Sequence, residues 1–307
     1  MAETLSDNNP SLAAVVRVDN PPPDRSTLKT VLTMLVLVIL IALVWEGAKS
    51  FARAQEYKLN LFGSEIDLSI FNNTKLPHLG DIARAFGEPA QRNGPPLYQT
   101  LINYSLFTFS EALLGFGIGS ILGFLLAIIF AHSSLLQRGL LPYVVASQTI
   151  PILAIAPMVV IWMRNIGQSS LAVPVIAAYL TFFPVTIYTL RGLTSVPQTS
   201  LELMHSYAAT RWQILWKLRI PNALPHIFTA FKISATASVV GAVIGELPSG
   251  IQNGLGIALL NFTQFYNQSP PRLWAAIVAA ALLGIIFFVS MSLLERLVVR
   301  WQVKESD

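Results

Sequence analysis

Apolar residues gather along this chain into long stretches that are almost free of charge, with polar breaks between them. An α-helix that crosses a membrane needs about 20 predominantly apolar residues, because each residue adds about 1.5 Å of rise. The pattern predicts an all-α, polytopic membrane protein with six transmembrane helices, at 29–46, 106–131, 140–163, 171–190, 223–247 and 273–294.

The polar segments complete the expected domain plan. Residues 1–28 are polar and contain the run Pro21-Pro22-Pro23, which predicts a disordered N-terminal tail rather than a signal peptide. The long segment 47–104 follows the first span. The remaining parts are a core of five helices at 105–297, which contains the loop 196–222, and a short C-terminal tail at 298–307.

The segment 47–104 contains one helical pattern of its own. Leu79, Ile82, Ala83 and Phe86 recur at helical spacing, whereas Asp81 and Arg84 fall elsewhere on the helical wheel. This pattern predicts a short amphipathic helix that lies on a surface.

Composition excludes a soluble protein of this size. Hydrophobic residues make up 53% of the 307 residues, and charged residues only 12%, roughly half the share of a soluble domain. The mean hydropathy is +0.58. The sequence contains no cysteine, which excludes disulfides, thiolate metal sites and cysteine nucleophiles.

The distribution of basic residues predicts the orientation. Eleven of the 20 Lys and Arg residues fall on the side of the two tails and the loop 196–222, and most of the others lie in the long segment 47–104. Basic residues far out in a long loop have little influence on topology. We therefore expect both termini and the loop 196–222 in the cytoplasm, and 47–104 outside, in a protein of the plasma (inner) membrane.

No pattern of catalytic or metal-ligating residues is found in the sequence. The four histidines are scattered without metal-ligand spacing, and neither a P-loop nor a Gly-x-Ser-x-Gly motif occurs. We expect no catalytic residue, metal or cofactor in this chain. Lys232 and Glu246 share one face of the fifth span about 21 Å apart, so they cannot pair within that helix. We expect both side chains to snorkel toward the ends of the span.

Small residues line one side of the second span, because Gly115, Gly119, Gly123, Ala127 and Ala131 recur every four positions. Such a stripe lets a second helix approach closely. Two interpretations stay open, namely simple helix packing and a sliding surface in a transporter.

The loop 196–222 predicts two short helices that join near Ala208–Thr210 and stop at Pro221. Met204, Tyr207, Trp212 and Trp216 give it apolar and aromatic character. On a cytoplasmic loop such a face indicates a partner protein. A helix resting on lipid headgroups is the alternative.

Residues 202–225 resemble the cytoplasmic "EAA" loop of permease subunits in ATP-binding-cassette (ABC) importers. Glu202 matches the acidic position of that loop, Arg211-Trp212 match its Arg-Trp pair, and Pro221 and Pro225 match its closing prolines. Two departures are plain. Leu203-Met204 replace the Ala-Ala pair, and Ala208 occupies a Gly position, a change that is tolerable if the turn needs no positive φ.

Other segments resemble one branch of that family, the permeases for nitrate, sulfonates, taurine, bicarbonate, riboflavin and thiamine precursors. The matching segments are Ile150-Pro151 with Ala156-Pro157, Trp162 and Gly167, then Glu246 with Gly254-Leu255-Gly256, and Leu76-Pro77 with Asp81-Ile82. The resemblance covers about residues 76–297. It implies the type I, MetI-like permease fold.

The resemblance also implies partners. They are two copies of an ATPase subunit, which binds the ATP and docks on the EAA loop, an external solute-binding protein, a second copy of this chain and membrane lipid, with no nucleic acid. The residues expected at the ATPase interface are Glu202, Ala208, Arg211, Trp212, Pro221 and Pro225.

The expected translocation path follows the axis of the homodimer. Its expected lining residues are Pro151 and Pro157 on the third span with Ser234, Ser238, Gly241 and Gly245 on the fifth. Prolines free backbone carbonyls, and the small residues place no charge at mid-membrane. The alternative, that these stretches are packing surfaces within one subunit, stays open.

The cargo of such an importer is expected to be a small solute. The core spans carry aromatic residues and few midplane charges, which favours an aromatic heterocycle such as riboflavin or a pyrimidine thiamine precursor. The aromatic residues are Phe124, Phe130, Tyr143, Tyr179, Phe182 and Phe183. Sulfonate, taurine, nitrate or bicarbonate is the alternative cargo. A stand-alone secondary transporter or channel is the competing class, but no internal repeat or midplane charge favours it.

Overall fold

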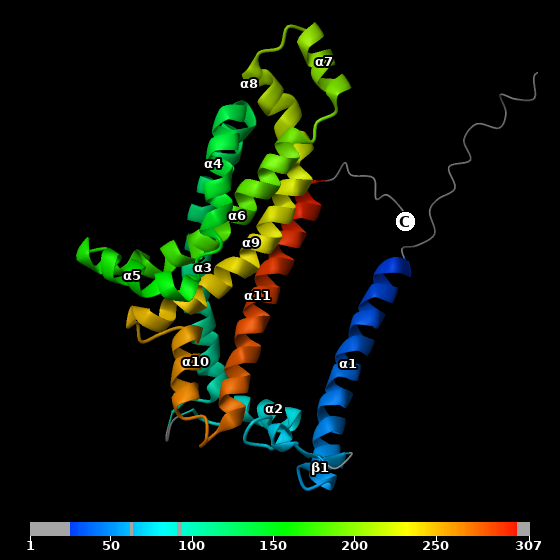
Figure 1. The fold of residues 1–307 in the computed structure, drawn as a ribbon, viewed down its shortest axis with the longest axis vertical. Coiled ribbons are helices and arrows are strands. Elements are labelled where there is room, and N and C mark those ends of the chain that lie inside the picture. Colours follow the sequence, from blue (N-terminus) through cyan, green and yellow to red (C-terminus); the bar gives the residue numbers. More distant parts are fainter. Residues whose placement is uncertain (1–24, 62–63, 91–93, 300–307) are drawn as a thin grey trace, which may run out of the picture. The chain divides into compact units, whose positions relative to one another are not determined.

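The computed structural model describes residues 25–61, 64–90 and 94–299. The chain forms two compact units that divide after Asn72 (Figure 1). Most of the expected tail 1–28 lies outside the described residues. Its last four positions, from Arg25, already belong to the first helix.

The first unit contains one long helix and a small hairpin. Helix α1 spans Arg25–Ala54 and includes the predicted span 29–46. Strands β1 (Lys58–Leu61) and β2 (Ser64–Asp67) pair antiparallel, with Lys58 opposite Asp67, and a short 3₁₀ turn, η1 (Ser69–Phe71), follows. The aliphatic side chains from Leu35 to Leu40 are all more than half exposed within the unit, which suits a helix surrounded by lipid.

The second unit is a helical bundle. Its elements are α2 (Leu79–Gly87), α3 (Leu97–His132), α4 (Ser134–Ser147), α5 (Ile152–Asn165), η2 (Ser169–Leu171), α6 (Ala172–Thr194), α7 (Gln198–Ser206), α8 (Arg211–Ile214), η3 (Leu215–Arg219), α9 (Ile220–Ser249), α10 (Leu255–Gln264) and α11 (Pro270–Val298). The described residues contain five helices, α1 among them, that are long and apolar enough to cross a membrane. A bent pair of helices can form the sixth span.

The bent pair corrects the third predicted span. The stretch 140–163 is not one straight helix, because α4 and α5 meet at an angle of 97°. Pro151 stands at the break and disfavours helical backbone at the residue before it, so α4 ends at Ser147 and α5 begins only at Ile152. The polar residues Ser147-Gln148-Thr149 stand at the break, and the predicted span ran through them.

Helix α6 packs between α3 and α9, and glycines make the approach close. A Cβ atom on Gly119 of α3 would lie 2.6 Å from the Ala178 carbonyl oxygen of α6, and one on Gly241 of α9 would lie 2.7 Å from the Ala177 Cα. Such distances leave no space for a side chain. The stripe of small residues on α3 therefore serves helix packing, as its simpler interpretation predicted.

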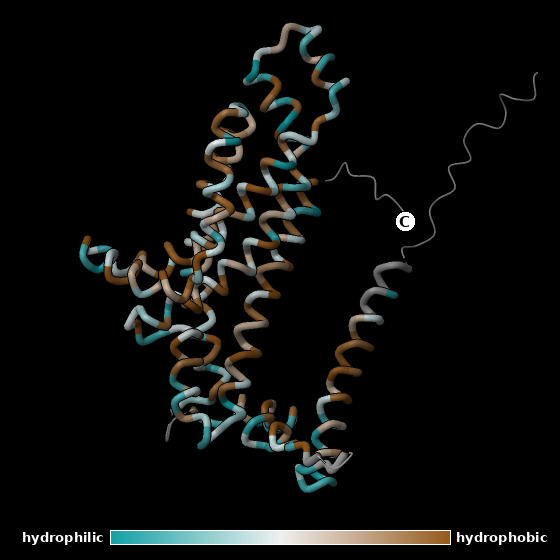
Figure 2. Tube along the Cα trace, in the orientation of Figure 1, coloured by the Kyte–Doolittle hydropathy of each residue, from teal (hydrophilic) through white to brown (hydrophobic). Residues whose placement is uncertain are grey.

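The predicted helix is present as α2, and its expected position on a surface stays a prediction. Ile82 and Ala85 are buried in one hydrophobic cluster with Leu97 and Leu101 of α3 and with residues of α11. The apolar face of α2 therefore packs on the bundle. Figure 2 shows hydrophobic residues along α11 and hydrophilic residues concentrated toward both ends of the bundle, the pattern expected of a membrane-spanning core.

Candidate functional site

The loop between α6 and α9 folds into a compact projection at one end of the bundle (Figure 1). We call residues 198–219, which comprise α7, α8 and the π-helical turn η3, the coupling segment. Two short helices joined near Ala208–Thr210 were predicted here, and the structure confirms both helices, with the joint at residues 207–210.

The end of α7 depends on a left-handed residue. Ala208 has φ +51°, and it follows the last turn of the helix. The Ala208 amide donates to the His205 carbonyl (2.9 Å), and the Ala209 amide donates to the Met204 carbonyl (3.0 Å). These two bonds form a Schellman motif, whose left-handed position is usually glycine. The turn therefore needs a positive φ at this position. Alanine would be unstrained only in a turn without a positive φ, so Ala208 is strained here.

The start of α8 is fixed by a reciprocal cap. The Gln213 amide donates to the Thr210 hydroxyl (3.3 Å), and the Thr210 amide donates to the Gln213 side-chain oxygen (2.8 Å). This capping box satisfies two amides that a helix start would otherwise leave unpaired. Together with the Schellman motif it sets the turn between α7 and α8.

The coupling segment is anchored on the bundle. Leu215 is fully buried and Ile214 nearly so, and the Arg219 guanidinium donates to the Ala131 carbonyl at the end of α3 (3.1 Å). The ring of Trp212 lies near that of His132, with centroids 6.0 Å apart. A displacement of the coupling segment would therefore act directly on α3 and α9.

The outer face of the coupling segment is exposed and aromatic. Tyr207 is 77% exposed, Trp212 65% and Trp216 59%. The carboxylate of Glu202 is also exposed, and it accepts one hydrogen bond from the Gln198 amide at 3.3 Å. Large exposed aromatic side chains on a polar projection indicate an interaction surface.

The expected stop at Pro221 is wrong. The π-helical turn η3 carries the chain from α8 directly into α9, and Pro221 lies in the first turn of α9. Proline has no backbone N–H to donate and would crowd the preceding turn of a regular α-helix, and here the wider π-helical turn η3 precedes it. Pro225 lies farther inside α9. The coupling segment is consequently continuous with a helix that crosses the bundle.

Four of the six residues expected along a translocation path are buried within the subunit: Ser234, Ser238, Gly241 and Gly245 on α9. The Ser234 hydroxyl donates to the Thr181 carbonyl of α6 (3.2 Å), and Gly241 and Gly245 face the backbone of α6. These contacts are those of helix packing within one subunit, the alternative that the sequence left open.

Pro151 and Pro157 lie differently, because both are exposed. Pro151 precedes α5 and Pro157 lies within it, and α5 contributes its buried residues to a small cluster with α6. The exposed side of α5 is available to a second copy of the chain, so the expected role of the two prolines stays a prediction.

A buried carboxylate links α9 to α10. Glu246 is fully buried, and it accepts hydrogen bonds from the Thr108 hydroxyl (2.7 Å) and the Gly256 amide (2.6 Å). The Leu255 amide donates to the same Thr108 hydroxyl (2.9 Å). A Cβ atom on Gly254 would overlap this carboxylate, so the glycine lets α10 begin directly beside it. The carboxylate thereby caps the start of α10, where helix amides and dipole favour an anion.

The expectation of snorkelling is wrong for Glu246, and it stays a prediction for Lys232. Glu246 faces the bundle interior, and Lys232 forms an ion pair with Glu295 of α11 at 2.8 Å. Sequence reasoning did not assign Glu246 to the start of α10. The signal was present as the glutamate followed by Gly254-Leu255-Gly256.

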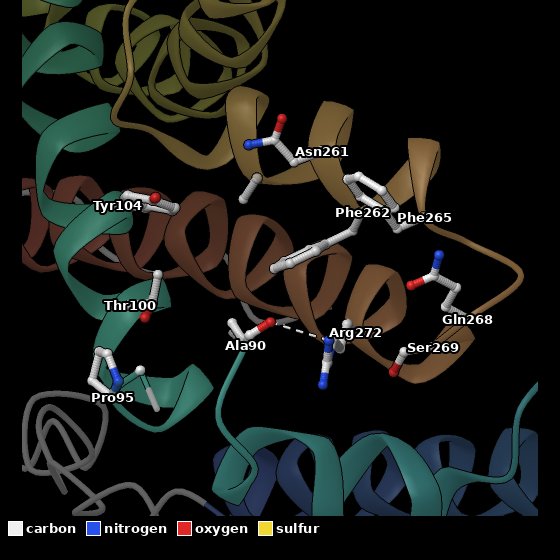
Figure 3. Close-up of a pocket in the computed structure, with 12 residues that line it drawn as sticks. Ala90, Pro95, Thr100, Tyr104, Asn261, Phe262, Phe265, Gln268, Ser269 and Arg272 are labelled. Atoms are coloured by element: carbon white, nitrogen blue, oxygen red, sulfur yellow. Dashed lines mark hydrogen bonds between the residues drawn. The ribbon is translucent and has the colours of Figure 1, made fainter. Parts of the chain in front are cut away.

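A cavity of about 650 Å³ lies at the end of the bundle opposite the coupling segment. Its walls come from α3, α10, the start of α11 and the residues that precede α3 (Figure 3). Three aromatic residues, Tyr104, Phe262 and Phe265, line it together with the guanidinium of Arg272.

Comparison with known proteins agrees with this architecture. Residues 119–300, more than half of the 307, match the family described as binding-protein-dependent transport system inner membrane component. A crystal structure of an amino acid ABC transporter with histidines has a similar fold, with a TM-score of 0.51 at 17% identity over 67% of this chain and 95% of that chain. The chain has the MetI-like ABC permease fold.

Curated relatives include permeases for several small solutes. The formylaminopyrimidine transport permease ThiX of Halalkalibacterium halodurans is 35% identical over 62% of this chain and 74% of its own length. The riboflavin transport system permease RibX of Chloroflexus aurantiacus is 35% identical over 66% and 73%. The taurine transport system permease TauC of Escherichia coli is 28% identical over 67% and 70%.

The family match covers most of the helical core, and the relatives share the greater part of their length with it. Several apolar helices also identify the chain as a multi-pass membrane protein. The chain belongs to the family of binding-protein-dependent transport system inner membrane components and is the permease of an ABC importer for a small solute.

Proposed function

We propose that this chain imports a planar aromatic heterocycle, of the riboflavin or pyrimidine thiamine-precursor class, in a complex that a separate ATPase drives. The ATPase binds the ATP and docks on the coupling segment, and an external binding protein delivers the solute. One observation carries the coupling to an ATPase: an exposed aromatic projection that continues without interruption into a helix crossing the bundle.

The continuity of the coupling segment with α9 supports a mechanical role. Leu215 and Arg219 anchor the segment on the bundle, while Tyr207 and Trp216 face outward. A partner that pushes on the outward face moves the cytoplasmic end of α9, because no flexible loop intervenes. Glu202 and Arg211 are exposed on the same projection, where they can pair with polar groups of the partner.

The complex requires two copies of the chain. One coupling segment offers one docking site, whereas ABC ATPases act as a pair that closes on two nucleotides. A homodimer with twofold symmetry is the simplest arrangement. The exposed side of α5, with Pro151 and Pro157, supports an interface or path there.

Both termini and the coupling segment lie in the cytoplasm of this arrangement, and the hairpin of the first unit lies outside. Because the chain has no cysteine, single cysteines report the topology. Ile70→Cys is expected to react with a membrane-impermeant maleimide added to intact cells. Tyr207→Cys is expected to react only after the membrane is permeabilised. The opposite pattern would overturn the orientation.

The relatives support the heterocycle over a small anion. Two relatives at 35% identity are named for formylaminopyrimidine and riboflavin, whereas the taurine relative is 28% identical. A sulfonate, taurine, nitrate or bicarbonate cargo is the alternative. Uptake of labelled riboflavin, pyrimidine and taurine by cells that carry the complete importer decides between these classes.

Dependence on the ATPase separates this proposal from a stand-alone transporter. Proteoliposomes that contain the permease, the ATPase and the binding protein are expected to accumulate solute only when ATP is present on the side of the membrane where the ATPase is bound. Glu202→Ala and Ala208→Glu are expected to abolish uptake while the permease still inserts. Glu88→Ala removes an exposed glutamate outside the coupling segment and serves as the matched control. Uptake without ATP or without the ATPase would contradict the proposal.

A further inference from the structure

We propose that a groove between α6 and α9 binds an anionic phospholipid of the cytoplasmic leaflet, with its phosphate at Arg191. The choice of leaflet rests on the proposed function, which places the coupling segment in the cytoplasm. The groove measures about 430 Å³. Six residues line it, namely Phe183, Pro184, Ile187, Tyr188 and Arg191 of α6 and Ile233 of α9.

The polarity of the groove changes along its length as the polarity of a phospholipid does. Arg191 stands in the last turn of α6, at the end of the bundle that carries the coupling segment (Figure 1). Phe183 lies about 12 Å farther from that end by helix rise, and Pro184 and Ile187 fall between the two. The groove therefore runs from a cation at the end of α6 to aromatic and aliphatic side chains in the spanning part of the helix.

A charged pair beside the groove indicates where the polar boundary of the membrane lies. Ile233 follows directly after Lys232, and the Lys232 ammonium pairs with Glu295 near the end of α11 (2.8 Å). Charged side chains avoid the hydrocarbon and gather at its edges. Because Ile233 and Arg191 line the same groove, we place the guanidinium of Arg191 at the level of the lipid headgroups.

The guanidinium of Arg191 is available to a phosphate. The residue is exposed, and its guanidinium has no hydrogen-bond or ion-pair partner within the described part of the chain. Arginine binds a phosphate best through two parallel N–H groups, and both terminal nitrogens can serve here. Tyr188, one turn away in the same groove, is a residue type that gathers at membrane interfaces.

The charges of the lining favour an anionic headgroup over a zwitterionic one. The six lining residues include one cation and no carboxylate, and both helices are described along their whole length. Phosphatidylethanolamine brings an ammonium group that finds no carboxylate in this lining, whereas phosphatidylglycerol brings only hydroxyl groups besides its phosphate. Anionic lipids of the cytoplasmic leaflet also attract basic residues at the end of a span.

Apolar side chains from two helices form the deeper part of the groove. Phe183, Pro184 and Ile187 come from α6, and Ile233 of α9, which is 37% exposed, borders the other side. A groove left empty in a bilayer forfeits dispersion contacts, which an acyl chain restores. The lipid thus lies with its headgroup at Arg191 and an acyl segment along Phe183 and Ile233.

A lipid in this groove bridges the two helices that flank the coupling segment. Helix α6 ends at Thr194 shortly before the segment, and α9 begins at Ile220 directly after it. The lipid contacts both helices at their cytoplasmic ends, so it stabilises one spacing between them. We therefore expect the coupling of ATP hydrolysis to transport to depend on anionic lipid.

The binding test uses the permease in complex with its ATPase, in detergent, with added phosphatidylglycerol or phosphatidylethanolamine of identical acyl chains. Native mass spectrometry counts the retained lipids. Arg191→Gln is expected to lower the retention of phosphatidylglycerol about five- to tenfold, because a charge-assisted contact to the phosphate is lost. Arg296→Gln removes the same charge from an exposed position on α11 outside the groove, and it is expected to leave retention unchanged.

Two further variants separate the groove from charge alone. Ile233→Trp fills the groove and keeps Arg191, so it is expected to lower retention as well. Arg191→Lys keeps the charge without the paired N–H groups, and its retention is expected to lie between wild type and Arg191→Gln. Equal retention of phosphatidylglycerol by wild type, Arg191→Gln and Ile233→Trp would overturn the site. Equal retention of the two lipids by wild type would overturn the preference for an anion.

A transport measurement separates this site from the proposed function. In proteoliposomes with the complete importer, wild type is expected to import more riboflavin per ATP when phosphatidylglycerol is mixed into phosphatidylcholine, and Arg191→Gln is expected to lose this dependence. Uptake of taurine in place of riboflavin would overturn the proposed function and leave the lipid site standing. A disulfide between two permease chains at Ile187→Cys would show that a second copy covers the groove. Loss of riboflavin binding from Ile233→Trp, with lipid retention unchanged, would assign the groove to the solute.

Discussion

Ala208 strains the coupling segment, and the strain can be relieved by one substitution. Its φ of +51° places a Cβ atom in the left-handed region at the end of α7. That conformation costs a residue with a Cβ roughly 1–2 kcal/mol, whereas glycine adopts it freely. Glycine also gains about 0.4–1 kcal/mol of freedom in the unfolded chain, which offsets part of the benefit. Ala208→Gly is therefore expected to stabilise the turn by about 0.5–1 kcal/mol.

Hydrogen exchange measures this effect locally. The amides of Ala208 and Ala209 donate the two bonds of the Schellman motif, so they exchange only when the turn opens. A gain of about 0.5–1 kcal/mol slows their exchange roughly two- to fivefold. Ala208→Asn is expected to lie between glycine and alanine, because asparagine tolerates the left-handed region. Ala208→Val is expected to exchange faster than wild type, because a branched side chain is an outlier there.

The order of the variants is the critical result. If the turn is left-handed, protection decreases from Gly to Asn to Ala to Val. Equal exchange in all four proteins, or faster exchange in Ala208→Gly than in wild type, would refute the reasoning. The amides of the capping box at Thr210 and Gln213 provide an internal reference, because the substitution does not alter their acceptors.

Three further predictions concern the interior of the bundle. Glu246→Gln places a donor opposite the first amides of α10 and is expected to lower the stability of the fold by about 1–3 kcal/mol, which a lower melting temperature in detergent would report. An unchanged melting temperature would contradict the capping role. Gly119→Val forces α3 away from α6 and is expected to lower the stability of the fold by about 1–3 kcal/mol. Gly117 has open space around it, so Gly117→Val is expected to be nearly neutral, and equal effects of the two variants would disprove the close approach. Lys232→Met is expected to destabilise more in wild type than in a Glu295→Gln background, and a double-mutant cycle that gives no coupling would exclude a stabilising pair.

The helical plan of this chain was accessible from its sequence because hydrophobic length is a direct physical requirement of the bilayer. Charge-free stretches located the long helices, and the spacing of Leu79, Ile82 and Phe86 located α2. The bend between α4 and α5 was missed, although polar residues, Ser147-Gln148-Thr149, and Pro151 stand at the break. Proline was an ambiguous signal: Pro151 stands at a break, but Pro221 and Pro225 lie within a continuous helix.

The coupling segment was located by its motif, but its strain was not. The sequence showed alanine where related loops carry glycine, and only the backbone angle of Ala208 reveals the positive φ. The charged residues of the fifth span show the same limit. Helical spacing established that Lys232 and Glu246 cannot meet, but their partners Glu295 and Thr108 lie on other helices. Contacts between distant segments depend on packing that no local pattern encodes.

Docking of a separate ATPase on the coupling segment is tested most directly by single-cysteine crosslinking in membranes. Tyr207→Cys, on the outward face and in a chain without other cysteines, is expected to crosslink to the ATPase subunit, with a yield that changes when ATP is added. Ile285→Cys, exposed on α11, is the control and is expected to give no such product. A crosslink to the ATPase at Tyr207→Cys but not at Ile285→Cys is the predicted result. Absence of the crosslink from Tyr207→Cys and from Leu203→Cys, in membranes that import the solute at the expense of ATP, would contradict the docking site.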